Sequence, residues 1–179
     1  MDSSLLTLVD CSSGGVMKLQ LDRKADYAVR ATLVLARAYG TGRRKVRHIA
    51  RTMDIPQRYL PQVVSPLISA GIVVTVSGPD GGYELSRPPK DVSLLDVIEA
   101  VDGPLEGDRC LLQGGPCDWD EVCPVHDAWL RAHRVLAREL GRTTFAELAR
   151  VDALLEAGTL SVAPGSRHPV RVERRGVRE

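Results

Sequence analysis

The feature that most constrains the fold of this chain is a pair of short amphipathic segments separated by three residues. In the first segment, VRHIARTM, apolar residues recur at i, i+3, i+4 and i+7, and the second segment, residues 60–67, repeats that spacing. This is the period of one helix face. A turn as short as Asp54, Ile55 and Pro56 between two such helices predicts a helix-turn-helix, whose second helix enters the major groove of DNA. Ordinary helical bundles show the same pattern.

The neighbouring segments favour a winged helix over a bundle. Residues 17–40 predict a helix that is capped by Asp22 and ended by Gly40. Residues 72–86 contain two β-rich runs around a Gly/Pro/Asp turn, which predicts a hairpin. Three helices followed by a hairpin is the order of a winged helix-turn-helix.

Two short helices and one long helix are predicted after the hairpin. Each short helix begins with a capping-box pattern, in which the N-cap side chain and the side chain three residues later bond each other's backbone N–H groups. The patterns are Ser93 with Asp96, before a helix ending near Gly103, and Thr144 with Glu147, before a helix through Leu155.

The long helix is predicted to run from Pro124, which suits a first turn, to Gly141. An exposed apolar seam along this helix needs a partner, and we expect the same helix of a second subunit, hence a homodimer. The predicted fold class is therefore mainly α with a small β-hairpin: a winged helix-turn-helix plus a long dimerisation helix. The seam consists of Val125, Trp129, Ala132, Leu136 and Leu140.

Candidate DNA contacts lie in both helices of the helix-turn-helix. Cations bracket the first helix, where phosphates would lie. At the exposed start of the second helix, Arg58 can bind guanine in a bidentate manner and Gln62 can read adenine, unless both are simply solvated. Pro66 lacks the N–H that would bond to Gln62, so we expect a kink there. The candidates are Arg43, Arg44, Lys45, Arg47 and Arg51 for phosphates, and Gln57, Arg58, Tyr59 and Gln62 for bases.

The segment RCLLQGGPCDWDEVCPVH, residues 109–126, holds three of the four cysteines and a histidine. Six residues separate Cys110 from Cys117, five separate Cys117 from Cys123, and two separate Cys123 from His126. A disulfide framework is a poor explanation, because three clustered thiols leave one unpaired. Thiolates with an imidazole suit zinc or an iron-sulfur cluster equally well. Unligated structural cysteines are the remaining alternative.

Charge and motifs together divide the chain into four parts. Residues 17–90 carry 13 Lys or Arg against 5 Asp or Glu, a net charge of +8, whereas residues 91–157 carry 6 against 14, a net charge of −8. A basic segment of this kind indicates a polyanionic partner, although solvated charged faces have the same composition. We assign residues 1–16 to a disordered or non-native N-terminal extension, with Met17 as a candidate start, and residues 17–90 to a winged helix-turn-helix DNA-binding domain. Residues 91–157 are assigned to a cluster-binding loop and dimerisation helices, and residues 158–179 to a flexible basic tail.

No long uncharged apolar run or signal-peptide pattern is present, so we expect a cytoplasmic protein with no membrane partner.

Five motifs in sequence order resemble the Rrf2 family of winged-helix regulators. They are KADYAVRA, IPQRYLPQVVSPLISAGIV, the wing GPDGGYELSRP, DVIEAVDG and the cysteine segment, and the resemblance covers residues 17 to about 156. It implies a homodimeric transcription factor, not an enzyme, that binds a double-stranded DNA operator and senses redox state, nitric oxide or iron-sulfur status. Cys110, Cys117 and Cys123 match the cluster ligands of the family, with a first gap one residue longer than is typical of IscR-like members.

The resemblance leaves two alternatives for the fourth cluster ligand. His126 matches the histidine that completes the [2Fe-2S] site of IscR-like members, and Asp26 matches the aspartate that the partner subunit donates to the [4Fe-4S] cluster of NsrR-like members. We favour His126 and [2Fe-2S], because His126 lies in the same loop; Asp26 could instead pair only with Arg30. Ser77 is the candidate DNA contact of the wing; it stands where IscR-like members carry a minor-groove arginine, so the resemblance does not by itself predict minor-groove reading there.

The rival to a cluster is a structural zinc site in a nucleic-acid or protein adaptor with no sensing role. A thiol redox enzyme is disfavoured, because the sequence has no C-x-x-C pair.

Overall fold

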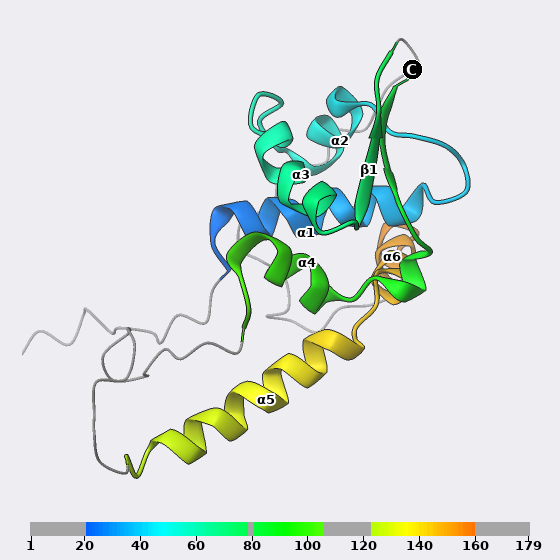
Figure 1. Ribbon diagram of the computed structural model, residues 1–179. Helices are drawn as coiled ribbons and strands as arrows, with labels where there is room; N and C mark the ends of the chain where they lie inside the picture. The colour runs from blue at the N-terminus through cyan, green and yellow to red at the C-terminus, as the bar shows by residue number, and fades with distance from the viewer. Residues whose placement is uncertain (1–20, 79–80, 106–122, 160–179) are drawn as a thin grey trace, which may run out of the picture.

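The computed structural model describes residues 21–78, 81–105 and 123–159 (Figure 1). These ranges contain helices and one two-stranded antiparallel sheet, which confirms the predicted fold class. The elements in chain order are α1 (Arg23–Arg37), α2 (Val46–Met53), α3 (Leu60–Ser69), β1 (Val73–Val76), β2 (Gly82–Leu85), the 3-10 helix η1 (Pro89–Asp91), α4 (Leu94–Asp102), α5 (His126–Arg142) and α6 (Phe145–Glu156).

Helix α1 forms the centre of the fold. It contacts α2 and α3 on one side and α4 and α6 on the other (Figure 1). Its Ala28 and Ala31 are fully buried, and such small side chains let neighbouring helices pack closely. Phe145, the first residue of α6, is also fully buried and belongs to the same hydrophobic core as the helix-turn-helix. Residues on both sides of position 90 therefore share one core.

The helix-turn-helix is formed by α2 and α3, at the predicted positions. Asp54 ends α2 in the left-handed conformation, with φ 52°, and the Ile55 N–H donates to the Ala50 carbonyl at 2.9 Å. Ile55 itself is buried, which fixes the turn to the core. Helix α3 continues from Leu60 to Ser69 with Pro66 inside it.

The hairpin is extended on one edge by the segment before α2. Strands β1 and β2 pair with Val73 opposite Leu85 and Val76 opposite Gly82. Arg44 forms a further bridge to Tyr83, with N···O distances of 2.9 and 3.0 Å. A Cβ atom on Gly82 would lie 2.7 Å from the Arg44 carbonyl oxygen. Glycine at position 82 therefore allows this edge to approach the hairpin.

The predicted N-cap residues cap three helices, but the capping box is complete only at α4, since at α6 Thr144 and Glu147 form one of the two expected bonds. The Asp22 carboxylate accepts from the Ala25 N–H at 2.7 Å, and Ser93 with Asp96 forms a complete capping box. At α6 the Thr144 hydroxyl accepts from the Glu147 N–H at 3.3 Å. Each contact satisfies backbone donors that a helix start leaves unpaired.

Helix α5 differs from the prediction at its N-terminal end. It begins at His126, because Pro124 and Val125 form a turn in which the His126 N–H donates to the Cys123 carbonyl at 3.2 Å. A proline fixes φ but suits a turn as well as a first helical turn. Figure 1 shows α5 extending away from the body, and none of its residues is buried.

Two short backbone segments join the beginning of α4 to the junction between α5 and α6. The Leu94 N–H donates to the Thr143 carbonyl at 2.8 Å, and the Phe145 N–H donates to the Val92 carbonyl at 2.9 Å. Ser93 and Thr144 thus form an isolated antiparallel bridge. Across the described ranges, no helix is both long enough and apolar enough to span a membrane.

Candidate DNA-binding surface and metal-ligand residues

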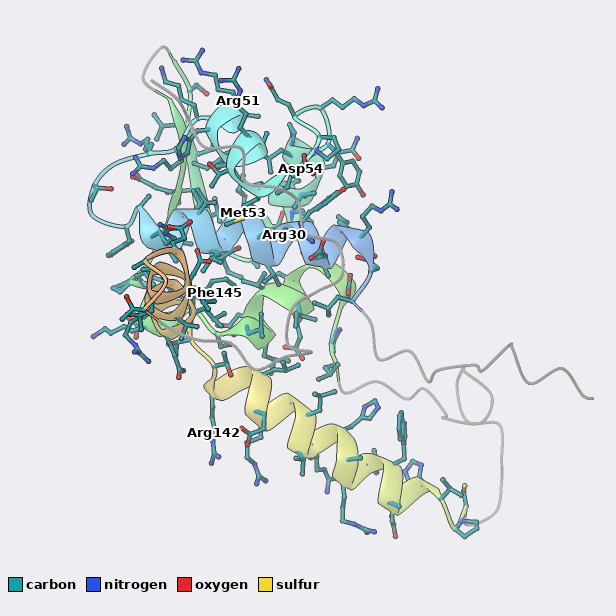
Figure 2. All side chains as sticks on the ribbon, turned by 180° about the vertical axis from the view of Figure 1, so that it is seen from behind. Arg30, Arg51, Met53, Asp54, Arg142 and Phe145 are labelled. Carbon is teal, nitrogen blue, oxygen red and sulfur yellow. The ribbon has the colours of Figure 1, made fainter. Side chains whose placement is uncertain are left out.

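The cations of α2 form the exposed part of the candidate DNA surface. Arg47 and Arg51 lie one helical turn apart, and both are exposed. Arg51 is on the side of the molecule remote from α5 (Figure 2). Neither side chain has an ion pair or hydrogen bond with another described residue. Their charges are therefore available to phosphates.

The cations before α2 are partly engaged within the protein. Arg43 Nε lies 3.3 Å from Glu84 Oε1 on β2. Arg44 donates through Nη2 to Thr41 Oγ1 at 3.1 Å and through Nη1 to the Arg43 carbonyl at 3.4 Å. Lys45 is exposed and occupies the N-cap of α2. Glu84 reduces the charge that Arg43 can offer to DNA.

The predicted base-reading residues lie around the first turn of α3. Gln57 and Arg58 are exposed, but they lie in the turn before α3 and not within it. Gln62 is exposed on α3. Tyr59 is the N-cap and is only half-exposed, contrary to the exposed position predicted for it. Its ring packs edge-on against Tyr27 of α1, with ring centroids 5.9 Å apart.

Ser77, the predicted wing position, follows β1 directly and is exposed. The hairpin turn beyond it includes residues 79 and 80, which lie outside the described ranges.

Two of the candidate metal ligands belong to the same turn at the beginning of α5. Cys123 is half-buried, and His126, exposed, follows it within one turn. Cys110 and Cys117 lie outside the described residues. No group of three or more His, Cys, Asp or Glu side chains that could hold a metal ion is found among residues 21–78, 81–105 and 123–159.

Asp26 forms a bidentate ion pair with Arg30 one turn along α1 (Arg30 is labelled in Figure 2). The Nε–Oδ1 and Nη2–Oδ2 distances are both 2.9 Å, and the two side chains are about 40% exposed. This is the pairing that we considered as the alternative to ligation by Asp26. The arginine occupies one lone pair on each carboxylate oxygen, so it competes with a metal for these atoms.

The carboxyl end of α4 approaches the beginning of α1. Partial desolvation raises the pKa of Asp102, the charge of Asp22 raises it further, and Lys24 opposes the shift. Asp102 is the last residue of α4. Negative charges therefore repel each other where α4 ends.

Sequence reasoning missed two residues that shape the candidate DNA surface. Glu84 neutralises Arg43, and Tyr27 holds Tyr59. The strand register pairs Glu84 with Val74, so the two side chains share one face of the hairpin. No local signal indicates the tertiary contact between the two tyrosines.

Comparison with known proteins gives a consistent result. A family model for Rrf2, described as an iron-dependent transcriptional regulator, matches residues 21–151. The chain belongs to the Rrf2 family of transcriptional regulators. Among curated Rrf2-type relatives, it is 33% identical over 138 residues to IscR of Klebsiella pneumoniae, covering 77% of this chain and 84% of the relative. It is 30% identical over 131 residues to CymR of Bacillus subtilis, covering 73% of this chain and 90% of the relative.

Solved structures support the same assignment for this Rrf2 regulator. The structure of CymR, titled the global cysteine regulator of B. subtilis, matches with a TM-score of 0.66 and 29% identity, covering 75% of this chain and 98% of that chain. The structure of T. potens IscR matches with a TM-score of 0.63 and 28% identity, covering 83% and 96%. The predictions of a DNA-binding transcriptional regulator and of no enzymatic activity are confirmed.

Proposed function

We propose that this Rrf2 regulator is a homodimeric repressor that senses redox state, nitric oxide or iron-sulfur status through an iron-sulfur cluster. The proposed ligands are Cys110, Cys117, Cys123 and His126, with Asp26 as the alternative fourth ligand. The observation that carries the proposal is that Cys123 and His126 share one turn at the beginning of α5. The family description as iron-dependent supports it.

The local chemistry around Cys123 fits a thiolate ligand. Cys123 lies just before the first turn of a 17-residue helix, where unpaired N–H groups and the helix dipole favour negative charge. His126 is exposed, so its imidazole is accessible to a ligand. A bound cluster would supply the response to oxidants and nitric oxide. Donors of this type suit iron and zinc alike, so the metal must be identified by experiment.

The cations of the helix-turn-helix would bind the DNA backbone. Arg47, Arg51 and Arg58 are exposed, and within the described ranges none has a polar side-chain partner. Gln62 is exposed on the helix expected in the major groove. This arrangement around α2 and α3 favours phosphate contacts by Arg47 and Arg51, and base contacts by Arg58 and Gln62.

The apolar seam of α5 would form the dimer contact. The helix extends from the body, and Trp129, Leu136 and Leu140 are only half-buried within one chain. A helix of this length offers about 25 Å of contact. Pairing with a second copy would bury this seam. The dimer would then present two helix-turn-helix units to a two-fold symmetric DNA site.

Anaerobic purification with iron, sulfide and zinc analysis tests the cofactor. We expect iron and labile sulfide, with visible absorption that disappears in Cys123→Ala. His126→Ala should change the spectrum more than Asp26→Ala does, while His48→Ala, at an exposed histidine on α2, serves as the control. Colour retained in Cys123→Ala would refute Cys123 as a ligand, and colour retained in the Cys110→Ala, Cys117→Ala and Cys123→Ala variants alike would refute the cluster. About one zinc per chain without iron would favour the structural zinc adaptor.

A further inference from the structure

Arg87, which lies just after β2, contacts three separate parts of the fold. Its Nε donates to the Asp91 carbonyl at 2.9 Å, and its Nη1 donates to the Gly71 carbonyl at 3.4 Å. Its Nη2 lies 3.4 Å from Asp96 Oδ2. All three guanidinium nitrogens are therefore used, although the side chain is 37% exposed.

The three acceptors lie on three separate elements of the fold. Gly71 is the turn between α3 and β1, and its φ of 67° lies in the left-handed region. Asp96 completes the capping box of α4 by accepting from the Ser93 N–H at 2.9 Å. Asp91 ends η1. Arg87 thus joins the base of the hairpin to the end of the candidate recognition helix and to the beginning of α4.

A second residue strengthens the same joint. The Ser86 hydroxyl contacts the Gly71 carbonyl and donates to the Ile72 carbonyl at 3.1 Å. The Ser86 N–H also donates to the Ile72 carbonyl at 3.0 Å. The Gly71 carbonyl, at the end of α3, therefore receives donors from two consecutive residues of the hairpin base. The outer half of the hairpin is held on one edge by the Arg44–Tyr83 bridge and the Arg43–Glu84 ion pair, while Val74 and Val76 are 38% and 39% exposed.

We propose that Arg87 is a positioning residue for DNA binding, which sets the orientation of the hairpin relative to α3 and α4. The hairpin carries the Arg43–Arg44 segment on its edge through the bridge to Tyr83. Its orientation therefore decides where the cations of that segment lie relative to α3. The DNA consequence rests on the proposed phosphate contact of Arg44, whereas the orientation itself does not.

The geometry requires an arginine and not just a positive charge. A guanidinium presents donors in a fixed planar fork, so it can bond acceptors in several directions at once. A lysine ammonium is a single point and cannot reach Gly71, Asp91 and Asp96 together. Arg87→Lys should therefore keep the charge and the fold while losing the orientation.

Residual dipolar couplings of the amides test the orientation directly in the full-length protein without DNA. In the wild type, couplings from β1, β2 and α3 should fit one rigid arrangement. In Arg87→Ala and Arg87→Lys the hairpin couplings should no longer fit the orientation of α3. Arg37→Ala is the matched control, because Arg37 also joins separate elements, contacting Asp152 at 3.0 Å and Glu156 on α6, but far from the hairpin. It should leave the hairpin couplings unchanged.

Salt dependence of binding to a random-sequence duplex tests the consequence. In the wild type, Arg44→Ala should reduce the slope of log K against log salt by about 0.9 per protomer. When Arg87 is already Ala or Lys, Arg44→Ala should change the salt slope by less than half as much. The difference between the two changes is the coupling between Arg87 and Arg44, which a double-mutant cycle measures. The Arg37→Ala background should retain the full effect.

Wild-type hairpin couplings in the folded Arg87→Lys variant would overturn the proposal. Changed couplings with a lost Arg44 effect would support it. If the couplings change while Arg44→Ala has no effect even in the wild type, Arg87 still positions the hairpin, and the proposed phosphate contact of Arg44 is what fails.

Discussion

Binding to DNA should weaken steeply with salt, and the structure sets the size of the effect. Arg47 and Arg51 are exposed and have no ion pair or hydrogen bond with another described residue, and the other candidate phosphate contacts, Arg43, Arg44 and Lys45, directly precede α2. Three to five cations per protomer give about 6 to 10 phosphate contacts in a dimer, hence a slope of log K against log salt of about −5 to −9. A rise from about 50 to 200 mM salt should then lower the affinity by about three to five orders of magnitude.

Single substitutions divide this slope among residues. Arg51→Ala should make it shallower by about 0.9 per protomer. Glu84→Gln should make it steeper by up to about 0.9 per protomer, because Arg43 loses the carboxylate 3.3 Å away. Arg150→Ala is the matched control: it removes the same charge from an exposed position on α6, away from α2. Its slope should equal that of the wild type.

Fluorescence anisotropy of a labelled random-sequence duplex, titrated at several salt concentrations, gives each slope. The duplex need not contain the operator, because phosphate contacts supply nearly all of the non-specific affinity. A wild-type slope shallower than about −2 would refute the phosphate contacts. Equal changes in Arg51→Ala and Arg150→Ala would show that net charge, and not the surface formed by α2, determines the binding.

Three further predictions concern stability. Phe145→Ala should lower the free energy of unfolding, measured in urea, by about 3 to 5 kcal/mol, because the ring is fully buried; a loss below about 1 kcal/mol would contradict its place in the core. Gly82→Ala should separate the Arg44 edge from the hairpin and expose its N–H to hydrogen exchange, because the new Cβ would meet the Arg44 carbonyl at 2.7 Å; unchanged exchange would count against this. The pKa of Asp102 is raised by desolvation and by Asp22, so its protonated form is favoured in the folded state. The penalty for ionising Asp102 therefore appears as pH rises through its folded pKa, and Asp102→Asn should raise Tm at pH 7 but not at pH 3.

The sequence predicted most of the fold because burial on one face imposes a period on each helix. The apolar spacing of residues 46–53 coincides with α2, and the caps at Asp22 and Ser93 mark the first residues of their helices. The beginning of α5 was predicted two residues early, since Pro124 is compatible with both a turn and a helix. Local patterns determine such boundaries only within a few residues.

The candidate site was less accessible to sequence reasoning, because its electrostatics depend on tertiary contacts. The exposure predicted for Tyr59 was too high, since no local pattern reveals Tyr27 as its partner. The pairing of Arg43 with Glu84 depends on the hairpin and on the strand that precedes α2. The residue types and their spacing identify Cys123 and His126 as candidate metal ligands. The geometry of ligation depends on the folded site and cannot be derived from spacing.

The backbone bridge between Ser93 and Thr144 has a mechanical consequence. Because residues 92–94 and 143–145 exchange hydrogen bonds, a rotation of α5 about its C-terminal end also turns the first residues of α4. Asp96 lies in that first turn and contacts Arg87 at the hairpin base. Cys123, about 25 Å away along α5, is therefore linked to the base of the hairpin through α5, the Ser93–Thr144 bridge and the Asp96–Arg87 contact, a path that does not include α3.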